Sequence, residues 1–449
     1  MWCARAAAAA IWQGYLPPWV LSHPPAAAII PGTLVPAAPA QHQGHVPAHA
    51  PDVQDAIDNF MHLKKLQLTC FRNYSDLNID FNKDTVLIFG DNGRGKTNLL
   101  ESIYYLSAGR SHRSSNSDEL IKWGSDFALI RAHVDGRLIE LEFRAGNNLK
   151  IKVDRVLCKK KSDFTNIMPA VLFTPDDLRI IKGGPSNRRE FLDDILEKIY
   201  PGYQALRLQY QKILNQRNSL LKSVDSVPKA NQNTTFEIWN ENLVKYGSEI
   251  IWKRYGLLNS IRPFFSGYMS KFFPEVTSGI QYVFSWERKN AIEDSESASE
   301  PDTIKNQSTG ITVDEISRHF KNKLDENLHR EIIYKTTITG PHRDDFLVIF
   351  GDRDIKAFGS QGQQRAAAVS LRFCELEEIR QKTGTNPVLL LDDILSELDT
   401  RRERIVLDLI KDRYQTFITT SNINYVSHIE EMGKDSVQEM TVTGNGISK

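Results

Sequence analysis

The feature that most constrains this chain is a phosphate-binding loop, in which two glycines five residues apart are followed by Lys and Thr. An apolar, β-branched run precedes the loop at 86–89, and apolar residues recur at helical spacing after it. A phosphate loop requires this order of strand, loop and helix. Its glycines turn backbone N–H groups toward the phosphates, and the start of the helix adds its positive dipole end. We expect Lys96 to reach the β- and γ-phosphates and Thr97 to hold Mg²⁺. The residues expected to cradle a nucleotide are Gly90, Asp91, Asn92, Gly93, Arg94, Gly95, Lys96 and Thr97.

A second motif is a buried strand that ends in two acids. Residues 388–391 are Val-Leu-Leu-Leu, which is typical of a parallel strand, and Asp392 and Asp393 follow at what would be the sheet edge. We expect Asp392 to hold Mg²⁺, directly or through water, beside Thr97, and Asp393 to polarise the attacking water as catalytic base. Phosphoryl transfer depends mainly on charge neutralisation and positioning, so Lys96, the metal and one base form a sufficient set.

A third motif marks the start of a helix. Ser360 and Gln363 fit a capping box, and apolar residues follow at helical spacing. A capping box is by itself structural, whereas a Gly- and Gln-rich helix start is also an anion site, and the residues alone leave both interpretations open. If this helix start faced the nucleotide of a second subunit, ATP would join two chains. The residues concerned are Ser360, Gln361, Gly362 and Gln363.

Composition excludes some classes of protein. The 449 residues suffice for two or three domains, and 56 basic against 56 acidic residues give no overall field that favours or forbids nucleic acid. The four cysteines have no paired spacing for zinc or redox chemistry, which indicates a reducing compartment. No apolar run approaches the length needed to span a bilayer, so we expect a cytoplasmic protein without a membrane segment.

Residues 1–60 differ in composition from the rest of the chain. They are rich in Ala, Pro and His, contain no Lys, and have Arg5 as their only strongly basic residue, so we expect them to be disordered. A signal peptide, based on the short apolar run behind Arg5, is the competing interpretation. A clear strand pattern starts directly after Met61. This favours a third interpretation, in which Met61 is the initiator and the preceding residues are a misassigned extension.

The remaining chain changes character along its length. Alternating apolar residues and a hairpin signal at 134–137 predict a small antiparallel unit and a β-rich flank around the phosphate loop. From about 188 to 329 the spacing is helical, with stripes that we interpret as core packing, and 288–310 is a polar stretch typical of a loose loop. A final strand at 416–420 and a polar tail are expected to close the chain.

Taken together, the motifs resemble the RecF family, bacterial DNA replication and repair ATPases of the ABC type related to Rad50 and SMC heads. The resemblance covers residues 61 to about 422 in the right order and is highly specific, whereas residues 1–60 have no counterpart in it. The matching motifs are Phe71 to Tyr74, Gly90 to Glu101, Gly109 to Arg113, Phe173 to Leu178, Lys182-Gly183 with Arg188-Arg189, Gly340 to Asp345, Ser360 to Arg365 and Leu391 to Asp399.

The resemblance implies an α/β fold: an ABC-type ATPase head assembled from both chain ends, with an inserted helical second lobe. The expected parts are the N-terminal part of the head at 61–187, the insertion at 188–335, the C-terminal part of the head at 336–425 and a tail at 426–449.

The resemblance also assigns residue roles. It implies that Ser360 is the signature serine that contacts the γ-phosphate held by a second subunit, and that Asp399 lies in the D-loop at the same interface. Asp393 stands where many ABC proteins have Glu, with hydrolysis expected to be slow. Residues 419–422 lack the switch histidine of transporters, which argues against transport and leaves the γ-phosphate sensor unassigned.

The implied activity is ATP-dependent binding to single- and double-stranded DNA at the junctions of gaps during DNA damage repair and the SOS response. The implied partners are RecO and RecR, which load RecA, and a second copy of the chain in an ATP-dependent homodimer. A weak DNA-stimulated ATPase is expected. Local charge suggests three groups of DNA contacts, none favoured over a solvated surface: Arg110, His112 and Arg113; Lys159 to Lys161; and Arg188 with Arg189.

Other functions stay as competing hypotheses. One is an ABC-type head with an SMC-like structural or other non-repair role, although the insertion is too short for an extended coiled coil. Another is a non-catalytic scaffold, suggested by Asp at the base position. Residues His342 to Asp345 fit either an ion-pair network or a partner surface.

Overall fold

A computed structural model describes residues 62–147, 149–159, 162–165, 167–224, 229–287, 310–421, 437–443 and 446–448. The expectations for residues 1–61, for 288–309, and for Lys160 and Lys161 lie outside the described residues. Within the described part, none of the helices is both long enough and apolar enough to cross a membrane.

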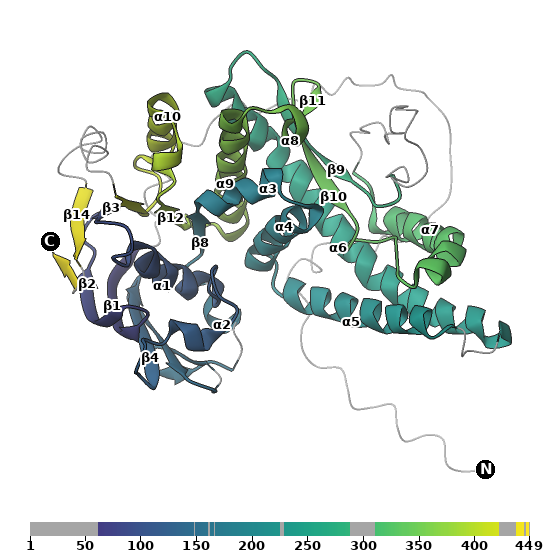
Figure 1. The fold of residues 1–449 in the computed structure, drawn as a ribbon, viewed down its shortest axis with the longest axis horizontal. Helices are drawn as coiled ribbons and strands as arrows, with labels where there is room; N and C mark the ends of the chain where they lie inside the picture. The colour runs from purple at the N-terminus through teal and green to yellow at the C-terminus, as the bar shows by residue number, and fades with distance from the viewer. Residues whose placement is uncertain are drawn as a thin grey trace, which may run out of the picture. The chain divides into compact units, whose positions relative to one another are not determined.

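A six-stranded, mostly parallel sheet lies at the centre of the head (Figure 1). Its strand order is β15-β14-β3-β13-β12-β8, and each pair is parallel except β14 with β15. The strands come from both ends of the chain, which confirms the expected assembly of the head. Their bounds are β3 (Thr85–Phe89), β8 (Ala170–Phe173), β12 (Val388–Asp392), β13 (Thr416–Thr420), β14 (Val437–Thr443) and β15 (Gly446–Ser448).

Both faces of this sheet are buried. Alternate residues of each strand point to opposite sides of the sheet, and each side packs into its own hydrophobic core. In β3, Leu87 packs into one hydrophobic core while Val86 and Ile88 pack into the other. The same alternation divides Leu389 and Leu390 of β12. Burial on both faces explains why these strands are continuous apolar runs.

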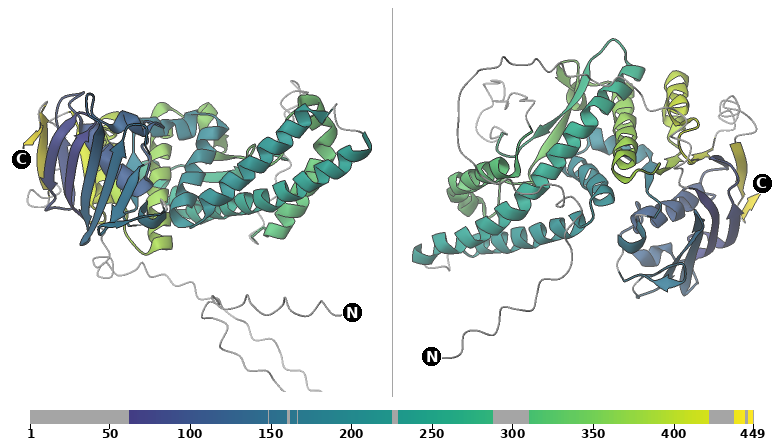
Figure 2. Two further views of the ribbon diagram at one scale, coloured as in Figure 1. Left: turned by 90° about the horizontal axis from the view of Figure 1, so that it is seen from below. Right: turned by 180° about the vertical axis from the view of Figure 1, so that it is seen from behind.

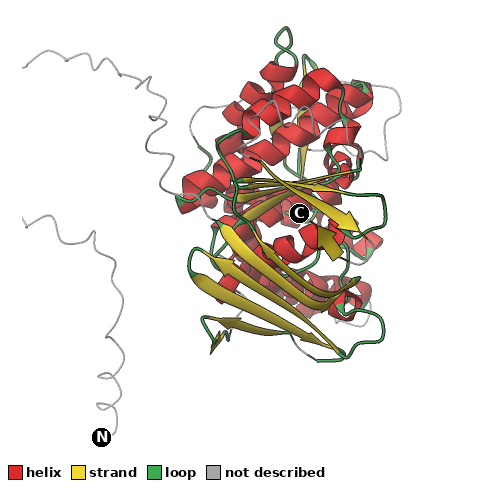
Figure 3. Ribbon diagram, turned by 90° about the vertical axis from the view of Figure 1, so that its left-hand side faces the viewer, coloured by secondary structure: helices red, strands yellow, loops and turns green. Residues whose placement is uncertain are grey.

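A second six-stranded sheet, in the order β2-β1-β4-β5-β6-β7, is antiparallel throughout and forms a separate layer (Figure 3). One face packs on α1 (Lys96–Ala108) and shares a core with the central sheet. Val134 pairs with Arg137, so the predicted hairpin is confirmed. The bounds are β1 (Leu63–Phe71), β2 (Tyr74–Asp80), β4 (Phe127–Val134), β5 (Arg137–Arg144), β6 (Lys150–Val153) and β7 (Val156–Leu157), with η3 (Ser117–Leu120) and α2 (Ser162–Thr165) beside them.

The middle of the chain is helical, as predicted. Its long helix α6 packs against α9, and α9 covers the other face of the central sheet (Figures 1 and 2). The 44-residue α6 packs against α5, α7 and α9, and its apolar stripe is buried as core. The helices are η4 (Pro175–Asp177), α3 (Leu178–Lys182), α4 (Pro185–Ile199), α5 (Tyr203–Lys222), α6 (Lys229–Phe272), α7 (Val313–Tyr334), α8 (Ile355–Phe358), α9 (Gln361–Thr383), η6 (Leu395–Glu397) and α10 (Thr400–Ile410).

Two parts of the fold differ from expectation. A strand within the helical region, β9 (Ser278–Val283), pairs with β10 (Asp345–Phe350), which also pairs with β11 (Arg353–Asp354). The prediction of a polar tail is also wrong in part, because β14 extends the central sheet beside β3 and buries Met440 and Val442. Val437 pairs with Thr85, more than three hundred residues earlier in the chain, and local pattern does not reveal which strands pair over such a distance.

Candidate nucleotide-binding site

The phosphate loop connects β3 to α1, as the sequence predicts. Gly93 and Gly95 have φ of 79° and 114°, a region that side chains rarely adopt. At Gly95 a Cβ atom would lie 2.5 Å from Asn73 Nδ2, so glycine is also required for space. The β1–β2 turn braces the loop: Asn73 Nδ2 donates to Arg94 O at 3.1 Å and Tyr74 Oη to Gly95 O at 3.0 Å. Sequence reasoning gave these two residues no role.

Lys96 is the first residue of α1, and its side chain folds back across the loop. Its Nζ donates to Gly90 O at 2.7 Å and to Asp91 O at 3.1 Å. Burial lowers the pKa of Lys96, and the nearby carboxylates of Asp393 and Asp392 oppose that shift. The ammonium therefore lies among loop carbonyls and acids, where the charge of a phosphate would be neutralised.

Asp392 and Thr97 meet although 295 residues separate them. Thr97 Oγ1 donates to Asp392 Oδ1 at 3.0 Å, and Thr419 Oγ1 donates to the same oxygen at 2.8 Å. Asp392 is 8% exposed, and burial raises its pKa while these two hydroxyls act against the rise. The hydroxyl and carboxylate oxygens form a pair of the kind that Mg²⁺ prefers.

Asp393 has two features that are unfavourable for stability. Its φ of 51° is in the left-handed region, and its Oδ1 is buried without a hydrogen-bond partner among the described residues. Its backbone N–H donates to Thr419 Oγ1 at 3.0 Å, so Thr419 positions both acids. The sequence predicted only a strand around Thr419 and the absence of a histidine, and did not reveal these contacts with both acids.

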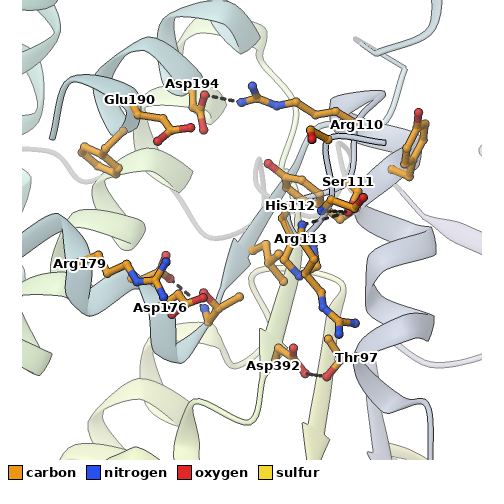
Figure 4. A pocket seen from close by; sticks show the side chains of 18 of the residues that line it. Thr97, Arg110, Ser111, His112, Arg113, Asp176, Arg179, Glu190, Asp194 and Asp392 are labelled. Carbon is orange, nitrogen blue, oxygen red and sulfur yellow. Dashed lines mark hydrogen bonds and ion pairs between the residues drawn. The ribbon is translucent and has the colours of Figure 1, made fainter. Parts of the chain in front are cut away.

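A polar cavity of about 870 Å³ has Thr97 and Asp392 among its lining residues (Figure 4). The segment after α1 lines one side, and Arg110 reaches across to form an ion pair with Asp194 of α4. Arg113 extends toward Thr97 and Asp392 in the same view, and its Nη1 donates to Asn98 Oδ1 at 2.9 Å.

His112 also lines this cavity, and its ring packs edge-on against Tyr104. Burial lowers the pKa of His112 to about 4, so this side chain carries no charge at neutral pH. Arg110, His112 and Arg113, one of the three candidate groups for DNA contact, thus line the cavity that contains Thr97 and Asp392, and His112 is neutral.

The predicted capping box is confirmed at α9. Ser360 N donates to Gln363 Oε1 at 2.7 Å, and Gln363 N donates to Ser360 Oγ at 3.3 Å. Asp399 caps α10 in a similar way by accepting Arg402 N at 2.9 Å. Among the described residues, no hydrogen bond or ion pair connects the segment 360–363 with the phosphate loop of the same chain. The same holds for Asp399.

Arg188 is not on a DNA-binding surface, contrary to one expectation. Its guanidinium is buried and donates to both carboxylate oxygens of Asp345, at 2.7 and 2.9 Å. Asp344 is also buried, where it accepts Tyr282 Oη at 2.6 Å and Ser285 N at 2.7 Å, and burial raises its pKa. Asp344 and Asp345 therefore form a buried polar network, a distinction that required knowledge of long-range packing.

Comparisons with known proteins agree with this geometry. A family model described as the RecF/RecN/SMC N terminal domain matches residues 62–448. A DNA replication and repair protein RecF from Oenococcus oeni is 37% identical over 377 residues, which covers 82% of this chain and 94% of the relative. RecF from Clostridium novyi is 36% identical over 394 residues, covering 87% of this chain and all of the relative.

Two solved structures of the recombination mediator protein RecF of the RecFOR pathway, named RecF-ATPrS and RecF-ATP, are also similar. Each is 32% identical and covers 87% of this chain and 98% of its own, with TM-scores of 0.73 and 0.72. This chain belongs to the RecF family of DNA replication and repair proteins.

Proposed function

We propose that this chain is an ATP-dependent DNA-binding repair protein that hydrolyses ATP slowly. The observation that carries the proposal is the contact of Thr97 with Asp392 at the start of α1, with Lys96 and Asp393 beside it. This set joins a phosphate cradle, an oxygen pair for a metal and a carboxylate whose Oδ1 has no hydrogen-bond partner among the residues that the structure describes. Nucleotide binding is further supported by the two RecF structures whose names include ATP or ATPrS.

Thr97 and Asp392 would hold Mg²⁺, and the metal would supply charge neutralisation for the β- and γ-phosphates. No described group of three or more His, Cys, Asp or Glu side chains could hold a metal ion. Mg²⁺ commonly keeps several waters and takes further ligands from substrate phosphates, so two protein oxygens suffice. Lys96 would neutralise phosphate charge, and Asp393 would orient and polarise the attacking water.

In this proposal two copies of the chain assemble on ATP. Following what the RecF resemblance implies, we assign Ser360 and Asp399 to the nucleotide of the second copy; within the described part of the chain, the hydrogen bonds of both residues are local helix caps. The dimer would bind DNA in the cytoplasm at single-strand gaps and at junctions of single and double strands. It would act with RecO and RecR to load RecA, and hydrolysis would release it.

The test is ATP hydrolysis by the full chain without DNA, with duplex, and with gapped duplex. We expect turnover that gapped DNA stimulates and that Asp393→Asn abolishes. Asn is a matched control, because it tolerates the left-handed backbone of Asp393 and removes only the charge. Lys96→Ala should also abolish turnover by removing the phosphate contact. Turnover that no DNA changes, together with no ATP-dependent affinity for DNA, would overturn the repair function.

A further inference from the structure

Gly362, in the first turn of α9, has an arginine side chain against its backbone. A Cβ atom at Gly362 would lie 2.7 Å from Arg402 Nη1 and 3.0 Å from both Arg402 Cζ and Nη2. Any other residue would therefore displace this guanidinium. The glycine provides the space in which Arg402 of α10 reaches the start of α9.

Arg402 also holds the loop that contains Asp399. Its backbone N–H donates to Asp399 Oδ1 at 2.9 Å, and its guanidinium forms an ion pair with the other carboxylate oxygen. The guanidinium lies over the ring of Phe273, with Cζ 5.3 Å from the ring centroid, and the side chain is 25% exposed. One side chain thus contacts Asp399, the start of α9 and the residue after α6.

A second arginine joins the same two segments from the opposite direction. Arg365 of α9 donates through Nη1 to Glu397 O at 2.6 Å and forms an ion pair with the Glu397 carboxylate. Arg365 therefore reaches from α9 to Glu397, and Arg402 reaches from α10 back to the start of α9. Two charged contacts fix these segments more tightly than one would.

Stability alone does not explain the position of Arg402. A cation near a helix start opposes the helix dipole, and Arg402 lies within the first turn of α10 and against the first turn of α9. Asp399 offsets this charge. The arrangement places a guanidinium against Gly362, two residues after Ser360, and against Asp399. Ser360 and Asp399 are the two residues assigned above to the nucleotide of a second chain.

We propose that Arg402 is a positioning residue that locks the start of α9 to Asp399, and that Gly362 lacks a side chain to admit it. This inference rests on the proposed ATP-dependent pairing of two chains. The competing explanation is that Gly362 is small in order to admit the nucleotide itself. The two explanations differ in whether the effects of changing Gly362 and Arg402 depend on each other.

The experiment compares Gly362→Ala, Arg402→Met and the double variant in the full chain. Sedimentation with and without ATP measures self-association, and a fluorescent ATP analogue measures binding to the single chain. We expect each single variant to weaken ATP-dependent association by about tenfold and to change analogue binding by less than about twofold. Because both break one contact, the double variant should be no weaker than either single variant. Thermal unfolding of each variant verifies that it is folded.

Two results would overturn the inference. One is a double variant whose defect is the product of the single defects, since independent effects multiply. The other is a Gly362→Ala defect without any defect in Arg402→Met. Arg402→Lys, which keeps the charge but not the planar guanidinium, should behave as Arg402→Met and replaces it if that variant does not fold.

Hydrogen exchange separates this inference from the proposed function, since it needs only the single chain. In either single variant, amide exchange should accelerate both in the first turn of α9 and at residues 399–402, because the two segments lose their common contact. Acceleration confined to the substituted segment would refute the lock. A wild-type chain that never associates with ATP would instead refute the pairing on which its functional role depends.

Discussion

Substitution of Arg188 by Met removes one half of a buried ion pair between α4 and β10. The guanidinium, 6% exposed, donates to both carboxylate oxygens of Asp345 at 2.7 and 2.9 Å and to Gly183 O at 3.0 Å. Methionine retains most of the apolar stem, so the change mainly removes a charge and the hydrogen bonds of the guanidinium. Asp345 is itself 5% exposed, so its carboxylate does not regain hydration when Arg188 is absent.

Removing one partner of a buried ion pair costs about 3–5 kcal/mol, because the remaining charge loses its compensation. Replacing both partners by apolar residues of similar volume is often neutral or even stabilising. We therefore expect Arg188→Met to lower the free energy of unfolding by ~3–5 kcal/mol, and Arg188→Met with Asp345→Leu to recover most of that loss.

Urea unfolding followed by circular dichroism measures this cost, provided that the slope with urea is unchanged. The salt dependence of DNA affinity, measured on the same variant at a temperature where it is folded, should equal that of the wild type. An unchanged unfolding midpoint, combined with a salt slope reduced by about one, would place Arg188 on the DNA interface and refute its burial.

Four further predictions concern the site and the sheet. Arg113→Gln should reduce turnover by about tenfold or more, with ATP binding retained, because it removes a guanidinium that extends toward Thr97 and Asp392 (Figure 4); single-turnover kinetics measure it. Burial raises the pKa of Glu287 to about 7, so its folded form retains a proton that the unfolded chain has lost, and stability falls as pH rises from about 4.5 to about 7. Thermal unfolding at pH 8 should show Glu287→Gln to be ~1–2 kcal/mol more stable than wild type, allowing for solvent screening, with little difference at pH 4. Met440→Ala should cost about 2–5 kcal/mol in urea unfolding, since Met440 is buried in β14. Asp393→Gly should unfold at a higher temperature than wild type while losing turnover, because glycine relieves the left-handed backbone and the unpaired oxygen.

Much of the head could be predicted because its signals are local. The glycine spacing of the phosphate loop, the apolar run before Asp392 and the capping box at Ser360 each lie within a dozen residues, and all three appear in the structure. These signals also gave the order of elements around the nucleotide site. Their physical basis is periodicity and backbone geometry, which need no knowledge of the rest of the chain.

What was missed depends on contacts between distant residues. Nothing near Arg188 indicates that Asp345 neutralises it, and Thr419 gains its role only when β13 lies beside β12. For β14 a local signal existed, since Met440 and Val442 alternate with polar residues and an Asn-Gly pair follows at 445–446. The polar composition of this segment outweighed that signal, because only Val437, Met440 and Val442 of β14 are apolar.

Asp392 and Asp393 differ in their surroundings, and this difference supports different roles for the two acids. Asp392 accepts hydrogen bonds from two hydroxyls at its Oδ1, which suits a group that must hold a fixed position. Asp393 has a strained backbone and a buried oxygen that finds no partner in the described part of the chain, which together cost roughly 2–5 kcal/mol if nothing compensates them. A fold retains such a cost only where its surroundings impose it, and here the Thr419 hydroxyl fixes the backbone N–H of Asp393. The carboxylate is thereby held with an acceptor unused, as the role proposed for Asp393 in orienting water requires.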